Sequence, residues 1–286
     1  MILGHCHVGP RGYFKRVWGE MKEEDGDFEH LARYLGETGY GKAVVFPPFG
    51  RDALMNAFAM EGDPNEWTFK AIAASRAGGP GASAPGAVDD RFIPWMTLTT
   101  VEGAAETLRE CARKGAKGVK FHPPVTRISP CDPRLDGFYA LAEELRMPVL
   151  YHTGPHGWLL DEYRPLVLDR VCQAHPKLPV VIEHLGGTGF IREAWAVMQN
   201  NRSAYGGLTS CLVPGMGWPV PADEAAAMMR EFGADRFLFG SDFPYNGAQA
   251  TRQAVEALKG FGLPAADLSL VMSGNLERLM GNVMQK

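Results

Sequence analysis

Residues 117–152, KGVKFHPPVTRISPCDPRLDGFYALAEELRMPVLYH, contain two short apolar runs separated by a helical pattern. Both runs, GVKF and PVLY, have the length of a strand, and the histidines His122 and His152 follow them directly. Between them, residues 135–146 place apolar side chains at the i, i+3 and i+4 spacing of an amphipathic helix. A strand, a helix and a second strand in this order predict a βαβ unit with parallel strands.

The same alternation extends over the whole chain. Apolar runs rich in Val, Ile and Phe lie at 2–7, 42–46, 92–98, 117–121, 148–152, 179–183, 203–208 and 236–240. Helical patterns lie between most of them, at 28–39, 102–115, 135–146, 163–175, 190–201, 221–233 and 248–262. Eight such units in 286 residues predict an α/β fold, the (β/α)8 or TIM barrel, as a single domain over residues 1–286. A doubly wound sheet is the alternative, but it needs a glycine-rich phosphate turn after the first strand, and HCHVGPRG is not one.

Three segments stand apart from this alternation. The loop at about 8–26 is long, carries aromatic and basic residues, and follows the first strand, so it is expected to cover an active site. Residues 76–90 are rich in Gly, Ala, Pro and Ser and predict a flexible surface excursion. Residues 268–281 predict terminal helices that close the barrel.

The composition excludes several classes of partner. The net charge is −4 and the Lys and Arg residues are spread along the chain, so no basic patch for nucleic acid is expected. No apolar run approaches the ~18–20 residues that span a bilayer. The five cysteines form no CxxC pair and no even-numbered disulfide framework. We expect a soluble, reduced, cytoplasmic protein that acts on a small molecule and binds neither nucleic acid nor membrane.

Polar side chains that bind metals gather at the predicted strand ends. Five of the eight histidines fall there, and a carboxylate follows at the last strand: His5, His7, His122, His152, His184 and Asp242. His5 and His7 are two residues apart in one strand, so they point to one side and Cys6 to the other. Because TIM barrels place their chemistry at the carboxyl ends of the strands, these side chains are expected to meet. Imidazoles with a carboxylate predict a divalent metal such as zinc.

The pattern resembles the amidohydrolase superfamily, with HxH on the first strand, His on the fifth and sixth, and Asp on the eighth. The forms HTG, EHLGG and FGSDFPY are similar to the amidohydrolase-related branch, which also contains metal-dependent decarboxylases. The resemblance implies the metal ligands His5, His7, His152 and Asp242. It also implies that His184 stands beside the metal as a general acid/base or oxyanion contact. One zinc ion and a homodimer are what this branch leads us to expect.

A metal held by such a ligand set can activate water for hydrolysis. Three imidazoles and a carboxylate leave a position for water, whose pKa falls from 15.7 to about 7 when a metal binds it. Asp242 is then expected to accept the proton of the water and to deliver it to the leaving group. His184 suits proton transfer or a hydrogen bond to a developing oxyanion, and the alternative is a structural histidine that orients a ligand.

Lys120 and His122 share strand parity, so both are expected to face the barrel mouth, with Phe121 turned toward the helices. In many superfamily members a carboxylated lysine on this strand bridges two metals. A second metal ion, bridged by a carboxylated Lys120, is therefore one alternative. Lys120 is otherwise an ammonium that binds an anionic substrate group, which we favour, or a structural lysine paired with an acid. His122 is expected to contact substrate or complete a ligand set, and a histidine bonded to backbone is the alternative.

Loops after the fifth and seventh strands supply further substrate-binding candidates, namely His156, Trp158 and Trp218. Glu183 precedes His184 and is expected to point outward, as a structural carboxylate with a buried partner. The predicted function is hydrolysis of a small carboxylate-bearing amide, lactone or ester by metal-activated water. The alternatives are non-oxidative decarboxylation of an aromatic or enoic acid, a metal-free lactonase, and a non-catalytic binding barrel. Loops decide the substrate, which the sequence does not identify.

Overall fold

The structure is a computed structural model that describes residues 1–49, 51–52, 57–58, 60, 62–76 and 90–284. Its strands are β1 (Ile2–His7), β2 (Lys42–Phe46), β3 (Arg51–Asp52), β4 (Ala57–Phe58), β5 (Phe92–Pro94), β6 (Met96–Thr97), β7 (Val119–Phe121), β8 (Val149–His152), β9 (Val180–Glu183), β10 (Ala204–Gly207), β11 (Phe237–Leu238) and β12 (Gly240–Phe243). Its α-helices are α1 (Tyr13–Trp18), α2 (Phe28–Thr38), α3 (Pro64–Arg76), α4 (Ala104–Arg113), α5 (Pro123–Thr126), α6 (Asp136–Glu144), α7 (Leu168–Ala174), α8 (Gly187–Asn200), α9 (Ala222–Phe232), α10 (Ala248–Lys259), α11 (Ala265–Ser269) and α12 (Asn275–Gly281).

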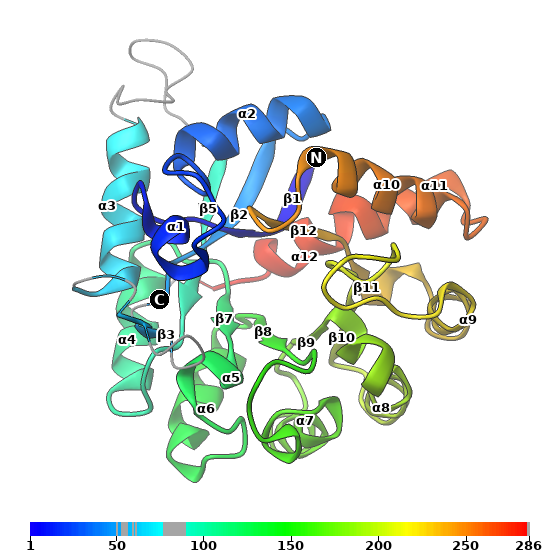
Figure 1. The fold of residues 1–286 in the computed structure, drawn as a ribbon. Coiled ribbons are helices and arrows are strands. Elements are labelled where there is room, and N and C mark those ends of the chain that lie inside the picture. Colours follow the sequence, from blue (N-terminus) through cyan, green and yellow to red (C-terminus); the bar gives the residue numbers. More distant parts are fainter. Residues whose placement is uncertain (50, 53–56, 59, 61, 77–89, 285–286) are drawn as a thin grey trace.

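The strands close into a barrel through two interrupted segments. One parallel sheet has the order β12-β1-β2-β5 and the other has the order β11-β10-β9-β8-β7-β6. Only Trp95 separates β5 from β6, and only Phe239 separates β11 from β12. Each interrupted segment belongs to both sheets, so the described residues form one ring of eight strand positions surrounded by helices (Figure 1). This confirms the predicted (β/α)8 barrel.

The helices cover the ring on its outer side. Six of the seven predicted helical ranges contain one helix each, namely α2, α4, α6, α7, α9 and α10, and the seventh, 190–201, overlaps α8, which begins three residues earlier. The sequence analysis missed α3, whose apolar residues do not gather on one side, although Asp63 caps its start by accepting the N–H groups of Asn65 and Glu66. The excursion expected at 76–90 lies, except for its two end residues, outside the described residues. Among the helices described, none combines the length and the apolar character needed to cross a bilayer.

The core has two layers, one on each side of the ring. Strand residues such as Leu3, Phe121 and Ile182 face outward and pack against the helices. Inside the ring, Val44, Phe46, Trp95, Leu150, Val181 and Leu238 pack against Leu276, Leu279 and Met280 of α12. Helix α12 therefore fills the end of the barrel where the strands begin, as predicted for residues 268–281 (Figure 1). The opposite end, where the strands finish, stays available for a site.

Candidate metal centre and active site

The backbone is unusual where the strands end. Among the described residues, five non-glycine residues of this region have left-handed conformations: His5 (φ 57°), His184 (φ 63°), Leu185 (φ 48°), Ser210 (φ 53°) and Asp242 (φ 62°). Such conformations cost energy and persist only where the surrounding structure holds them, which is typical of functional sites. In β1 the pairing register shifts between Gly4 and Cys6. His5 and His7 consequently both face the cavity while Cys6 lies in the outer core, which confirms the parity predicted for HCH.

A cavity of about 420 Å³ opens at this end of the barrel. Its polar lining comprises His5, His7, Lys120, His122, His152, His156, His184, Ser210, Asp242 and Asn246. Its aromatic lining comprises Trp18, Phe49, Trp218 and Tyr245. Trp18 belongs to the long loop after β1 and donates its indole N–H to the Tyr245 hydroxyl at 3.3 Å. The loop therefore contributes to the cavity wall, as predicted.

Three ligand atoms converge in the cavity at the spacing a metal ion requires. The Nε2 atom of His5 lies 3.1 Å from Nε2 of His7 and 3.2 Å from Oδ1 of Asp242. The distance from Nε2 of His7 to Oδ1 of Asp242 is 3.6 Å. Ligands bound at ~2.1 Å to one cation lie roughly 3.0–3.4 Å apart, so the residues present fit a divalent metal. We call His5, His7 and Asp242 the metal triad.

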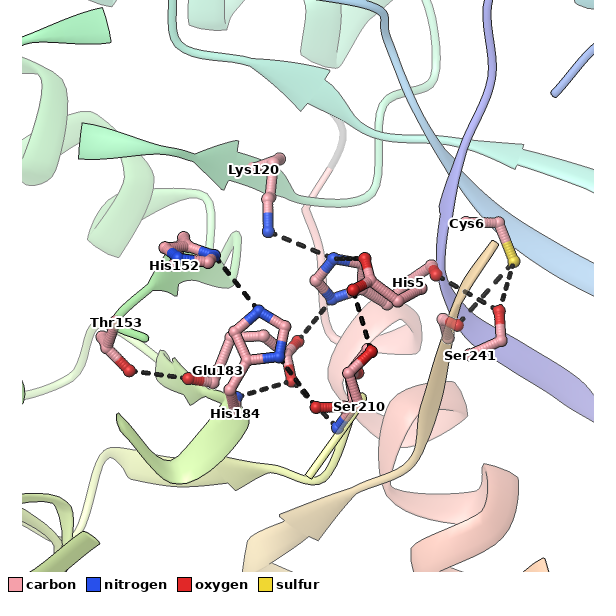
Figure 2. A network of polar contacts seen from close by, with 12 residues as sticks. His5, Cys6, Lys120, His152, Thr153, Glu183, His184, Ser210 and Ser241 are labelled. Atoms are coloured by element: carbon pink, nitrogen blue, oxygen red, sulfur yellow. Dashed lines mark hydrogen bonds and ion pairs between the residues drawn. The ribbon is translucent and has the colours of Figure 1, made fainter. Parts of the chain in front are cut away.

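Glu183 fixes the orientation of His5. Its Oε2 accepts the Nδ1 proton of His5 at 2.7 Å, and both side chains are buried (Figure 2). Its Oε1 accepts the backbone N–H groups of His184 at 3.1 Å and Thr209 at 3.3 Å. Burial acts to raise the pKa of Glu183, but the electrostatic interaction and the hydrogen bond with His5 outweigh it and lower the pKa to about 2. With the proton on Nδ1, the Nε2 lone pair of His5 is free for a metal.

The outward orientation expected for Glu183 is wrong. Glu183 has the same strand parity as Val181, which faces the barrel interior. His184 follows after the strand ends, and its left-handed backbone turns its ring inward as well. Strict alternation fails at this position because the backbone leaves the extended conformation.

His152 lies in the cavity but in a different group of ligand atoms from the metal triad. Its Nε2 lies 3.0 Å from the carbonyl oxygen of Gly154, and its Nδ1 lies 3.1 Å from Nε2 of His184 (Figure 2). Its ring stacks on that of His122 with 4.1 Å between centroids. Ligand atoms of His122, His152 and His156 lie within 4.8 Å of one another. The structure thus groups three of the four predicted ligands and places the fourth beside His184.

The environment of His184 keeps its ring neutral. Its Nδ1 donates to the carbonyl oxygen of Thr209 at 2.8 Å, which leaves Nε2 as the atom with the lone pair. Burial lowers the pKa of His184 to about 4, against the opposing effect of Glu183 and Asp242. A neutral imidazole in the cavity is a proton acceptor at neutral pH.

Lys120 is buried beside the metal triad. Its Nζ lies 3.2 Å from Nε2 of His5, and its side chain is 1% exposed (Figure 2). Burial lowers the pKa of Lys120 to about 8, while the carboxylates of Glu183 and Asp242 act to raise it. Lys120 is therefore mostly an ammonium at neutral pH. Phe121 lies in the outer core, as the predicted parity requires.

The remaining substrate-binding candidates divide into two sets. Trp218 lies in the cavity, with ring centroids 5.0 Å from His152 and 5.5 Å from His184. His122 and His156 also line it. Trp158 does not belong to this lining, because its ring stacks on Tyr163 with 5.9 Å between centroids. Sequence reasoning missed Ser210 and Asn246, which carry no local motif.

Comparisons with known proteins agree with this fold. The family model Amidohydro_2, described as amidohydrolase, matches residues 5–281. An uncharacterised TIM-barrel protein from Bordetella bronchiseptica is similar in structure, with 19% identity over 99% of both chains and a TM-score of 0.69. A probable 2-pyrone-4,6-dicarboxylic acid hydrolase from Acinetobacter baumannii, solved with citric acid bound, has 17% identity over 98% of both chains and a TM-score of 0.65. A dihydroxybenzoic acid decarboxylase from Polaromonas, solved with manganese and 2-nitroresorcinol, has 15% identity over 98% of this chain and 96% of that chain, with a TM-score of 0.68. No curated protein matches the sequence. The family match spans nearly the whole chain, and the protein therefore belongs to the amidohydrolase family.

Proposed function

We propose that this protein is a metal-dependent hydrolase of a small, carboxylate-bearing amide, lactone or ester. The observation that carries the proposal is the spacing of the metal triad, 3.1–3.6 Å between ligand atoms, on the floor of the cavity. Ligand atoms held this close without a cation are costly, because lone pairs and a carboxylate are brought together in a buried place. The family match supports an enzyme, and the triad supports a metal-dependent reaction.

His5, His7 and Asp242 would hold the ion, for which we propose zinc, and His152 is the proposed fourth ligand. The bound ion would polarise a substrate carbonyl and lower the pKa of a water to about 7. A single ion is favoured because Lys120, whose Nζ lies 3.2 Å from Nε2 of His5, is an ammonium and has no lone pair for a second cation. A second ion would require Lys120 to be carboxylated.

The residues around the triad have distinct tasks in this proposal. The pKa of Asp242 stays well below its usual range, because nearby histidines, His5 first, outweigh the effect of burial. Asp242 would therefore remain an anion that holds the cation, while the neutral His184 would accept the proton of the attacking water and return it to the leaving group. Lys120 binds the substrate carboxylate. Trp18 and Trp218, which line the cavity, would pack against the apolar part of the substrate.

One observation favours decarboxylation as the second candidate. The cavity combines a single lysine with four aromatic side chains, which suits an aromatic monocarboxylate. In that reaction the carboxylate would lie against the triad and a protonated side chain would deliver a proton to carbon. The Polaromonas decarboxylase shows that the same fold carries such a reaction.

Product analysis separates the two. The zinc-loaded protein is incubated with aromatic carboxylates and with carboxylate-bearing lactones, esters and amides, and products are identified by mass spectrometry. Addition of one water supports the hydrolase, and loss of carbon dioxide supports the decarboxylase. Turnover should vanish in Asp242→Asn. Full activity in that variant would refute the metal mechanism for both reactions.

A further inference from the structure

Ser210 is a buried serine whose hydroxyl lies against the metal triad. It is 2% exposed and follows β10, three residues beyond the end of the strand. Its Oγ donates to Oδ2 of Asp242 at 2.8 Å. Asn246 donates one amide N–H to the same Oγ at 2.6 Å and another to the carbonyl oxygen of Ser241 at 2.8 Å. Because the amide donates and the ionised carboxylate only accepts, the hydroxyl proton points toward Asp242.

The backbone of Ser210 has a left-handed conformation. Its φ is 53°, where a serine is strained and a glycine is not. Its carbonyl oxygen accepts the backbone N–H of Trp218 at 3.0 Å, which ties it to a residue of the cavity wall. Strain of this kind persists at sites where the side chain has a task.

We propose that Ser210 is a positioning residue of the metal centre, which holds Oδ2 of Asp242 so that Oδ1 alone faces His5 and His7. The inference rests on the metal centre of the proposed function. The hydrogen bond from Ser210 to Oδ2 opposes rotation of the carboxylate about its χ2 torsion and leaves Oδ1 to face the cation. Such partners of metal ligands orient the ligand and preserve its charge.

The test compares Ser210→Gly, Ser210→Ala and the wild-type protein. Each protein is freed of metal and titrated with Zn²⁺ against a chromogenic chelator. We expect the Zn²⁺ dissociation constant to rise ~10–100-fold in both variants, the range found for partners of metal ligands. If the role of Ser210 is purely structural, both variants should change the thermal midpoint and leave the Zn²⁺ dissociation constant unchanged. Ser210→Gly relieves the strain at φ 53°, so its thermal midpoint without metal should equal or exceed that of Ser210→Ala.

Two further variants sharpen the result. Ser75→Ala removes another buried hydroxyl, which donates to the carbonyl oxygen of Ile72 in α3, and should leave Zn²⁺ affinity unchanged. Asn246→Ala frees the Ser210 hydroxyl to rotate and should weaken Zn²⁺ binding, but not in the Ser210→Gly background. If the losses of Zn²⁺ affinity add in that double variant, Asn246 does not act through the Ser210 hydroxyl.

The outcomes separate this inference from the proposed function. If both Ser210 variants bind Zn²⁺ as tightly as the wild type while Asp242→Asn does not, Ser210 has no positioning role and the metal centre stands. If the wild-type protein itself binds no Zn²⁺, the metal centre and the role of Ser210 are both refuted. A weaker affinity in both variants, with Ser75→Ala unchanged, supports the assignment.

Discussion

Replacing Glu183 by Gln should move the ring proton of His5 from Nδ1 to Nε2. In the native protein Oε1 of Glu183 accepts two backbone N–H groups and Oε2 accepts the Nδ1 proton of His5. In Glu183→Gln, only the amide oxygen can accept those two N–H groups, so the NH2 group must face His5. His5 then has to accept at Nδ1 and carry its proton on Nε2, the atom that faces His7 and Asp242. A protonated Nε2 cannot bind a cation.

The structure sets the size of two effects. Loss of such a partner typically weakens metal binding ~10–100-fold, which is about 1.4–2.7 kcal/mol. The second effect is on folding, because the pKa of Glu183 is lowered from 4.5 to about 2. A depressed carboxylate pKa stabilises the fold above its unfolded value, and here that contribution is on the order of 3 kcal/mol at neutral pH. The stabilisation is lost as the pH falls from about 4.5 through about 2.

Zn²⁺ titration against a chelator measures the first effect, and urea unfolding of the metal-free protein at several pH values measures the second. The wild type should lose unfolding free energy between about pH 4.5 and 2, whereas Glu183→Gln should lack this part of the dependence. Glu193→Gln is the matched control, because it neutralises a carboxylate paired with Arg164 away from the cavity. Unchanged Zn²⁺ affinity in Glu183→Gln would refute the tautomer argument.

Three further predictions concern the same cavity. Removal of the metal should destabilise the protein, by ~2.7 kcal/mol if the ion was present at 100 times its dissociation constant, and calorimetry with and without a chelator checks this. In Gly154→Ala the new Cβ would lie 2.5 Å from the Trp218 ring, so KM should rise while Zn²⁺ affinity holds; an unchanged KM would exclude Trp218 from substrate binding. The pKa of Lys120 is lowered to about 8, so its ammonium is present below that pH and lost above it. KM for a carboxylate substrate should therefore rise above about pH 8, and Lys120→Met should show a high KM that no longer varies there, as steady-state kinetics would reveal.

The fold could be predicted because its signals are local. Strand-length apolar runs and helical periodicity depend on residues a few positions apart, and together they set a barrel. Parity within a regular strand was equally reliable, as Lys120 and Phe121 on β7 show. The short strands β3 and β4 and the helix α3 lack strong periodicity, and for that reason they were not predicted.

The sequence predicted which types of residue form the site, but not how all of their side chains are oriented and paired. Glu183 was misplaced because alternation does not continue into the left-handed backbone at His184. The sequence grouped His152 with His5 and His7, whereas the structure binds its two ring nitrogens to Gly154 and His184. Ser210 meets Asp242 across 32 residues of chain, and such a contact depends on the closed barrel and not on any nearby motif.

Because β1 pairs with β12, the metal triad also bears on how the barrel closes. These strands are neighbours in the sheet although they come from opposite ends of the barrel sequence. His5 and His7 lie on β1 and Asp242 lies on β12. An ion between them would therefore link the two strands whose pairing closes the ring. During synthesis the two histidines emerge well before Asp242, because β1 precedes β12 in the chain. Metal uptake would thus report that the barrel is complete.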